Sequence, residues 1–337
     1  MPPTFALSFH ADYGCRERGA CCTAGWPIPI EPDRRARVEV ALARGELDDV
    51  AAAPAVFVTA NHVTAAEALV AVHDGVCVFH SSRGAQRCAI HRALGHTALP
   101  LACRQFPRVT VHDPRGTSVT LSHYCPTAAE HLLRPGPIVI DDTPAAFPPD
   151  GEYAGLDAAG GLPPLLTPTV LMDWEGWWAL ERAAVALISE TTTSHEALAR
   201  LDRLVSEVEQ WRPGSHAFAD HVRAATHTAR SEGAVAAAGM PDAVERVHGA
   251  IPDEWRPPIP ALRRVQVSSA VHVRFLAAHA FANWTAHLGN GLRAWMRSIE
   301  AADGLIAHGF TVQEADLWLR HLVDPQALAE AVGGRGC

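Results

Sequence analysis

Cysteine is the residue type whose number and placement point most directly to chemistry in this sequence. Seven of the eight cysteines fall within the first 125 residues, and these are Cys15, Cys21, Cys22, Cys77, Cys88, Cys103 and Cys125. Thiolate sulfur is a soft ligand that selects zinc, copper or iron–sulfur clusters. We therefore expect these seven thiols to build a metal site around which the N-terminal half folds. Cys337 follows a glycine-rich end and is not expected to take part.

The expected cellular compartment and the spacing of the cysteines in the sequence indicate which type of site the thiols form. The N-terminus lacks the basic segment and long apolar run of a signal peptide, so we expect a reducing, cytoplasmic location in which disulfides are disfavoured. The cysteine spacings are wider than those of zinc fingers and differ from ferredoxin runs. Seven thiols also exceed what one tetrahedral zinc ion requires. The sequence favours an iron–sulfur cluster over zinc, and leaves open one cluster with spare thiols or two small sites completed by histidine. For any single cysteine, the alternative is a buried small hydrophobic residue.

The segments that carry the cysteines are short and rich in turns. Two apolar pieces, residues 77–80 and 88–91, are joined by a polar stretch, which predicts a hairpin-like or knuckle-like arrangement that places Cys77 near Cys88. Valine and leucine alternate on both sides of the turn sequence at 113–116, which predicts a second hairpin carrying Cys125 back toward Cys103. A region with so little regular structure is of the kind that a metal stabilises.

The second half of the chain has a different character. Proline and glycine crowd residues 134–170, which predicts a linker or a long wrapping loop. Capping boxes at Thr193–Glu196 and Thr311–Glu314 each precede an apolar helical face. Helices are expected at residues 31–50, 172–190, 194–211, 216–231, 261–288 and 312–322.

We therefore predict a mainly α protein in three parts. An irregular, metal-stapled cysteine-cluster domain with short hairpins spans residues 1–133. A proline- and glycine-rich linker spans 134–170, and a C-terminal helical bundle spans 171–337.

Charge and motifs argue against several classes of function. A net charge of −9 leaves no basic footprint for nucleic acid. The sequence has no run of 18 uncharged apolar residues, so no membrane span is expected. Dinucleotide-binding, phosphate-loop, zinc-protease and nucleophile-elbow motifs are absent from the sequence. The residues alone therefore identify no catalytic group, and they do not determine the oligomeric state.

The order of the cysteines and the residues beside them resembles a known family. The matching elements are Cys15, Cys21-Cys22, Cys77-x-Phe79, Cys88-x-Ile90, Cys103-Arg-x-Phe-Pro107 and Tyr124-Cys125-Pro126. They follow the pattern of the CxxCxxCC family of zinc- or iron-chelating cysteine clusters. Finer details within residues 5–135 are similar to one branch, the flagellin lysine-N-methylases. These details are Gly25-Trp26 before alternating isoleucines, Leu94-Gly95, Phe106-Pro107-Arg108 and the stretch 118–122.

This resemblance implies a cofactor, an activity and a partner. The cofactor is an iron–sulfur cluster (4Fe–4S), with zinc or an iron ion as the alternative, and the implied ligands are Cys15, Cys21, Cys22, Cys77, Cys88, Cys103 and Cys125. The activity is methyl transfer from S-adenosylmethionine to exposed lysines of a partner protein. This chain contains no lysine, so it is not its own substrate.

One departure from the family and two other functions remain open. Members of the family have a further cysteine between the positions of Cys15 and Cys21-Cys22. In this chain, residues 16–20 contain no cysteine. The alternatives to a methylase are a metal-binding or redox-sensing module without catalysis, and a metal-stapled domain that binds another protein.

Overall fold

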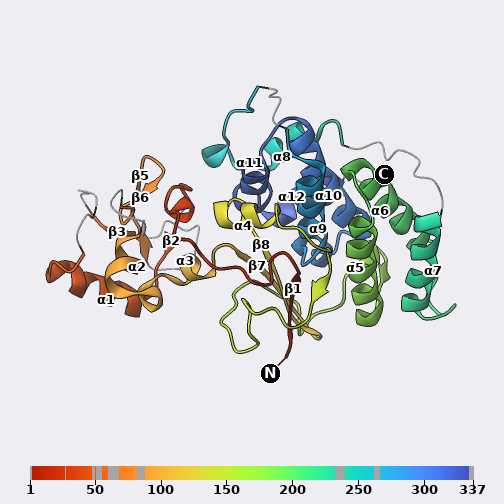
Figure 1. Cartoon of the computed structure of the whole chain (residues 1–337), viewed down its shortest axis with the longest axis horizontal. Coiled ribbons are helices and arrows are strands. Elements are labelled where there is room, and N and C mark those ends of the chain that lie inside the picture. The colour runs from red at the N-terminus through yellow and green to blue at the C-terminus, as the bar shows by residue number, and fades with distance from the viewer. Residues whose placement is uncertain are drawn as a thin grey trace. The chain divides into compact units, whose positions relative to one another are not determined.

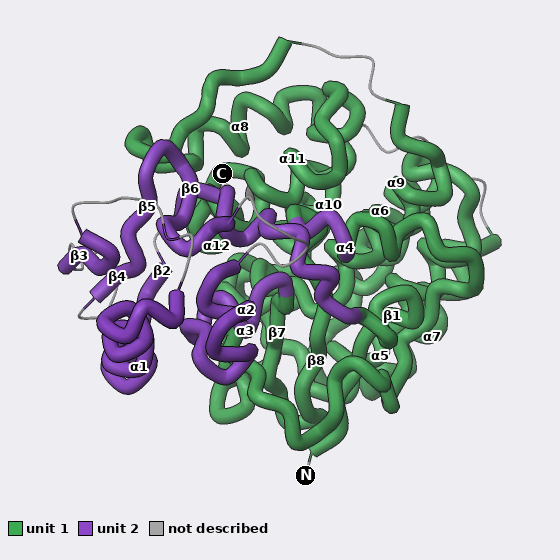
Figure 2. Tube along the Cα trace, turned by 60° about the vertical axis from the view of Figure 1, so that its left-hand side comes forward, with its two compact units in different colours: residues 1–13, 108–124, 128–337 green, residues 14–107, 125–127 purple. Residues whose placement is uncertain are grey.

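The computed structural model describes residues 2–26, 28–47, 50, 55–59, 68–81, 88–231, 240–261 and 266–333. Within these ranges the chain is mainly α-helical, as predicted, with twelve α-helices and several small sheets (Figure 1). It divides into two compact units, drawn in different colours in Figure 2. Unit 1 comprises residues 1–13, 108–124 and 128–337, and unit 2 comprises residues 14–107 and 125–127.

Unit 1 contains a five-stranded sheet of order β10-β7-β8-β1-β9. Its centre is the antiparallel hairpin of β7 (Arg108–Asp113) and β8 (Gly116–Leu121), which confirms the hairpin predicted around residues 113–116. Strand β1 (Thr4–Leu7) pairs in parallel with β8 and antiparallel with β9 (Ile140–Asp141). Strand β10 (Leu156–Asp157) pairs in parallel with β7. The outer strands β9 and β10 thus come from the proline- and glycine-rich segment.

These pairings divide the chain at points other than the predicted ones at 133 and 170. Residues 1–13 and the hairpin belong with the helical half, because β1 is hydrogen-bonded to β8 more than a hundred residues away. Residues 134–170 wrap within unit 1 and do not link two domains. Pairing between distant strands leaves no periodic signal in the sequence, so the boundary prediction could not have included it.

Eight helices follow the sheet strands of unit 1. They are α5 (Trp174–Ser189), α6 (Ser194–Val208), α7 (Phe218–Ser231), α8 (Ala243–Ala250), α9 (Ser269–Ala280), α10 (Leu292–Ala307), α11 (Val312–Leu317) and α12 (Pro325–Gly333). Shorter elements are α4 (Pro126–His131), η3 (Asp253–Trp255), η4 (Trp284–His287), the π-helical turn η5 (Trp318–Leu322) and the hairpin β11 (Leu165–Thr167) with β12 (Val170–Leu171). None of the described helices is long and apolar enough to cross a membrane.

Local signals set several of the helix ends. The Thr193 side chain accepts a hydrogen bond from the Glu196 amide at 3.2 Å, and the full capping box forms at Thr311. The predicted apolar face of α6 is buried in the core of unit 1. The helix predicted over 261–288 is shorter than expected, since α9 ends at Ala280 and Ala282 has a left-handed φ of 51°. Helices α8, α10 and α12 were not predicted.

A buried ionic group joins the hairpin to α5. The Arg115 guanidinium lies 2.9 Å from Glu181 Oε2 and 3.5 Å from Asp113 Oδ2, and all three side chains are almost fully buried. Trp178 Nε1 donates to the same Asp113 carboxylate at 3.1 Å. Each charge therefore has a partner, as a buried charge requires.

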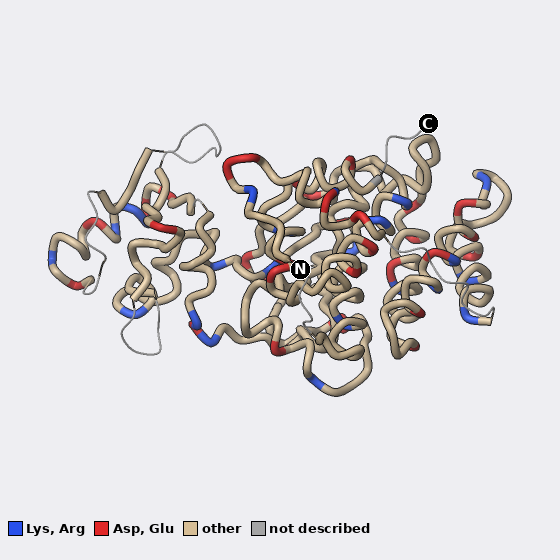
Figure 3. Tube along the Cα trace, turned by 90° about the horizontal axis from the view of Figure 1, so that it is seen from above, with Lys and Arg blue, Asp and Glu red and all other residues tan. Residues whose placement is uncertain are grey.

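Unit 2 is smaller and less regular. Its helices are α1 (Pro32–Ala43), α2 (Ala89–Leu94) and α3 (Leu101–Gln105), with the 3₁₀ turns η1 (Ala20–Cys22) and η2 (His96–Ala98). Its strands are β2 (Ile28–Pro29), β3 (Phe57–Thr59) and β4 (Ala68–Val70) in the order β2-β4-β3, and the hairpin of β5 (Val72–His73) with β6 (Val76–Cys77). Pro32 is the first residue of α1, as predicted. Acidic and basic residues are interspersed along both units (Figure 3).

Candidate metal centre

Five cysteines of unit 2, which we call the thiol group, come together from four segments of the chain. Cys21 and Cys22 lie in η1, Cys77 ends β6, Cys88 immediately precedes α2, and Cys103 lies in α3. All five belong to, or pack against, the same apolar cluster of unit 2. The seven described cysteines form no disulfide with one another.

Short-range contacts bring these segments to one place. A β-bridge joins His80 to Cys88, and His80 N donates to Cys77 O at 2.9 Å. The predicted approach of residues 77–80 and 88–91 is thus confirmed. The second piece is helical from Ala89, where α2 begins. Glu31 positions α3, since its carboxylate accepts a hydrogen bond from Leu101 N at 3.0 Å.

Cys22 is the centre of the thiol group. Hydrogen bonding with the side chains of Cys21, Cys77 and Cys88 raises the pKa of the Cys22 thiol far above its ordinary value, and burial adds to the rise. Cys22 therefore keeps its proton and donates it to its neighbours. Cys77 and Cys88 both lie more than fifty residues after Cys22 in the sequence.

Two neighbours of Cys22 are biased toward the thiolate. Hydrogen bonding from Cys22 lowers the pKa of Cys88 to about 7 against the opposing effect of burial, and the backbone N–H groups of His91 and Ile90 lower it further. The charge of Arg92 acts in the same direction. Hydrogen bonding from Cys22 also lowers the pKa of Cys21. Near neutral pH the group thus contains thiolate as well as thiol, and thiolate is the form that binds metals.

Cys103 lies at the edge of the thiol group. Burial raises the pKa of its thiol, and the neighbouring Cys21, Cys88 and Cys77 raise it further. Cys103 is therefore a neutral thiol beside partly ionised ones, which makes it a weaker candidate ligand than the other four.

The other two predicted ligands, Cys15 and Cys125, do not belong to the apolar cluster that contains these five. Cys15 is exposed in the loop before η1, where its sulfur accepts a hydrogen bond from Glu17 N at 3.3 Å. Cys125 is buried directly before α4. Its predicted approach to Cys103 stays a prediction, and Cys337 falls outside the described residues. The structure therefore gathers five of the seven predicted ligands.

The thiols do not form a preassembled coordination site. Over the described part of the chain, no three cysteine, histidine or acidic side chains are arranged so that they could hold a metal ion as they stand. Of the neighbouring histidines, His91 lies 3.3 Å from Glu17 and so has a carboxylate partner.

Arg92, which was not singled out from the sequence, belongs to the surroundings of this group. Arg92 stabilises the Cys88 thiolate and lies four residues after it, at one helical turn. The signal was the i, i+4 spacing, which would have required α2 to be predicted as a helix. Comparison with protein-family models, with curated proteins and with solved structures finds no match to this chain.

Proposed function

We propose that unit 2 is a metal-binding domain in which Cys21, Cys22, Cys77 and Cys88 hold the metal and Cys103 supplies a fifth thiol. The observation that carries this proposal is the convergence of thiols from separate segments on the buried side chain of Cys22. Unrelated buried cysteines behave as small hydrophobic residues, which gives them no reason to gather. In a metal-free site, protons take the place of the metal ion between the ligands. The ligand thiols then hydrogen-bond to one another, and some of them are ionised.

The chemistry of the donors fits a soft metal. On binding, the ion would replace the protons that the sulfurs now share, so uptake should release protons and become tighter as the pH rises. Sulfurs that share one tetrahedral zinc are about 3.8 Å apart, because each Zn–S bond is about 2.3 Å long. Such a spacing is close to that of thiols in mutual hydrogen bonding, whereas an iron–sulfur core holds its thiolates farther apart. The iron–sulfur cluster favoured by the sequence therefore requires a larger rearrangement than a single ion.

The metal would also stabilise unit 2. The apolar cluster of this unit is small, and the thiol group joins η1, β6, the start of α2 and α3. A metal bound by these segments supplies folding free energy, because the unfolded chain has no preformed site.

Metal and sulfide analysis after anaerobic purification tests the proposal. We expect the parent protein to bind metal and the Cys22→Ser variant to lose most of it. Cys337→Ser is the control that should retain it. Acid-labile sulfide in the parent would identify an iron–sulfur cluster, and stoichiometric metal without sulfide would identify a single ion. Full metal content in Cys22→Ser would overturn the assignment.

The Cys15→Ser variant distinguishes the seven ligands implied by the resemblance from the five cysteines of the thiol group. The resemblance includes Cys15 among the ligands, whereas the thiol group does not. Retention of metal in Cys15→Ser supports the five-cysteine set, and loss supports the seven-cysteine set.

The resemblance extends the proposal to methyl transfer from S-adenosylmethionine to lysines of a partner protein. Calorimetry with the metal-loaded protein should then show binding of S-adenosylmethionine. If the loaded protein does not bind it, a metal-binding module without this activity becomes the better proposal.

A further inference from the structure

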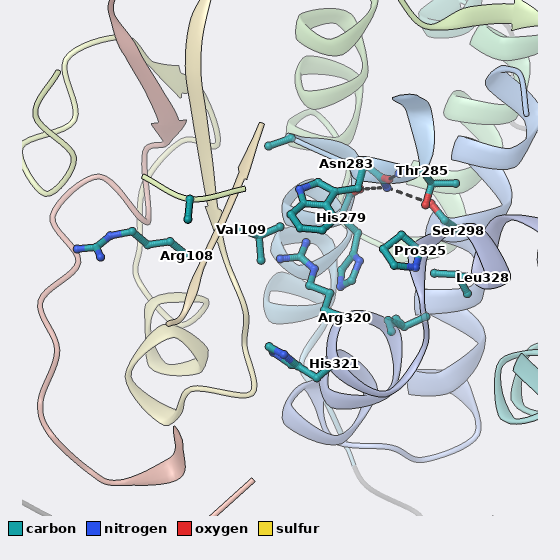
Figure 4. A pocket seen from close by; sticks show the side chains of 14 residues that line it. Arg108, Val109, His279, Asn283, Thr285, Ser298, Arg320, His321, Pro325 and Leu328 are labelled. Carbon is teal, nitrogen blue, oxygen red and sulfur yellow. Dashed lines mark hydrogen bonds between the residues drawn. The ribbon is translucent and has the colours of Figure 1, made fainter. Parts of the chain in front are cut away.

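Unit 1 contains a cavity that the metal proposal does not use. Its volume is about 290 Å³, and its walls come from β7, α9, η4, α10, η5 and α12. Trp284, Leu319 and Leu328 supply much of the apolar wall. Figure 4 shows the side chains of His279 and Arg320 next to each other at the cavity, whereas the guanidinium of Arg108 is directed away from it.

A buried carboxylate lies behind His279 and Arg320. Asp316 is fully buried, and its Oδ1 atom lies 3.3 Å from His279 Nε2 and 3.5 Å from Arg320 Nε. Its other oxygen accepts a hydrogen bond from Ser122 Oγ at 2.5 Å. The 3.3 Å separation from this carboxylate does not have hydrogen-bond geometry, but the carboxylate is the charged group nearest to Nε2, so we assign the imidazole proton to Nε2. The Nδ1 atom then carries the lone pair and is the hydrogen-bond acceptor.

Arg320 supplies hydrogen-bond donors. Its Nη1 atom donates to Leu121 O at 2.9 Å and its Nη2 atom donates to Ala278 O at 2.8 Å. Each of these nitrogens carries a second hydrogen, so two N–H donors remain. His279 Nδ1 has no hydrogen-bond partner among the described residues. The cavity thus presents a donor beside an acceptor.

Other polar groups of the wall are used within the protein. Asn283 Nδ2 donates to His279 O at 2.6 Å and to Ser298 Oγ at 3.0 Å. Ser298 Oγ in turn donates to Trp295 O at 2.7 Å. His321 Nε2, also on the wall, lies 2.7 Å from Ser122 Oγ. We assign recognition of the ligand to His279 and Arg320, which lie next to each other (Figure 4).

The charges of the wall favour a neutral ligand. No carboxylate is among the described residues that line the cavity, so a cation would find no negative partner on its wall. The positive charge of Arg320 is compensated by Asp316, so an anion would add an unmatched negative charge to a paired site. Burial lowers the pKa of His279 to about 4, and Arg320 lowers it further, so His279 supplies no charge at neutral pH.

We propose that this cavity binds a small uncharged carboxamide or lactam with an apolar or aromatic body. The carbonyl oxygen accepts a hydrogen bond from Arg320, the ligand N–H donates to His279 Nδ1, and the body packs against Trp284, Leu319 and Leu328. Pockets of this type are mostly apolar with a few polar groups that set orientation. The inference does not depend on the metal proposal, since every residue it uses belongs to unit 1.

Titration calorimetry of the full chain with benzamide tests the inference, with acetophenone and benzoate as comparators. Acetophenone lacks the N–H donor, and benzoate carries a charge at pH 7. We expect saturable 1:1 binding of benzamide, and acetophenone binding about three- to tenfold more weakly because one hydrogen bond is lost. Benzoate should bind more weakly than benzamide. Equal affinities for benzamide and acetophenone, or no saturable binding of benzamide, would overturn the proposal.

Variants and direct localisation complete the test. Leu328→Trp should fill the cavity and remove benzamide binding, whereas Leu162→Trp, at a position 75% exposed and outside the cavity, should leave it unchanged. His279→Phe should bring the affinities for benzamide and acetophenone together. Should these variants fail to fold, nuclear Overhauser contacts in the parent protein decide. Contacts from the benzamide ring to Trp284 and Leu328 support the site, and contacts confined to other residues refute it.

Discussion

Replacing Asp316 by asparagine should strongly destabilise unit 1. The Asp316 side chain is fully buried, and its carboxylate lies 3.5 Å from Arg320 Nε and 3.3 Å from His279 Nε2. Burial alone would raise its pKa, but Arg320, His123 and His279 together hold it well below the usual range. Asp316 is therefore the negatively charged member of this buried group near neutral pH. The variant keeps the shape of the side chain and removes its charge.

The magnitude follows from the charge that remains. Without Asp316, the Arg320 guanidinium stays largely buried with carbonyl partners only. Breaking a buried ion pair from one side typically costs about 3–5 kcal/mol. In a unit of this size, each kcal/mol lowers the melting temperature by about 2–4 °C. We therefore expect a decrease on the order of 10 °C. Removing both charges, with Asp316→Asn and Arg320→Met, should cost less than the sum of the single changes.

Tryptophan fluorescence during urea unfolding measures this effect in unit 1. Of the nine tryptophans, only Trp26 belongs to unit 2, so the signal reports mainly on unit 1. The control is Asp242→Asn, which removes an exposed pair with Arg246 at 2.7 Å. We expect that control to change the free energy of unfolding by less than about 0.5 kcal/mol. If Asp316→Asn is as stable as Asp242→Asn, the reasoning about the buried pair is refuted.

Three further predictions concern unit 1. Burial lowers to about 4 the pKa of three histidines, which are His279, His287 and His321. Because these histidines bind protons more readily in the unfolded chain, the free energy of unfolding is highest above pH 6.5 and declines as the pH falls toward 4. Urea unfolding should show a loss of about 1–2 kcal/mol per histidine between pH 7 and 5. An unchanged urea midpoint would contradict this prediction. Gly304→Ala should lower the melting temperature, because its Cβ would lie 2.5 Å from Ala243 Cβ, whereas Gly249→Ala, with open space around it, should raise the melting temperature slightly. Thr311→Ala should cost about 1 kcal/mol by removing the capping box, and calorimetric melting that shows no loss would disprove that role.

Local sequence signals predicted much of the helical structure and one hairpin. The capping residues Thr193 and Thr311, the proline that opens α1 and the apolar face of α6 all act within a few residues of chain. The turn at 113–116 acts over the same range and joins β7 to β8. Such features are readable because the interacting groups are neighbours in sequence, so spacing alone determines whether they meet.

The choice among the candidate ligands was decided by tertiary structure. Composition and spacing nominated seven cysteines, but the path of the chain between them determines which sulfurs meet. The bridge between His80 and Cys88 and the contact of Glu31 with α3 bring five of them together. Cys15, although only six residues before Cys21, remains in an exposed loop.

The architecture of unit 1 and its cavity also required the tertiary structure. Strand β1 pairs with a strand more than a hundred residues away, and His279, Asp316 and Arg320 meet only when α9, α11 and η5 pack together. No spacing rule connects these positions, since their approach depends on how whole helices bury their apolar faces. The sequence determined which segments become helices and where thiols are available. Long-range burial and strand pairing decided which of their polar groups became neighbours.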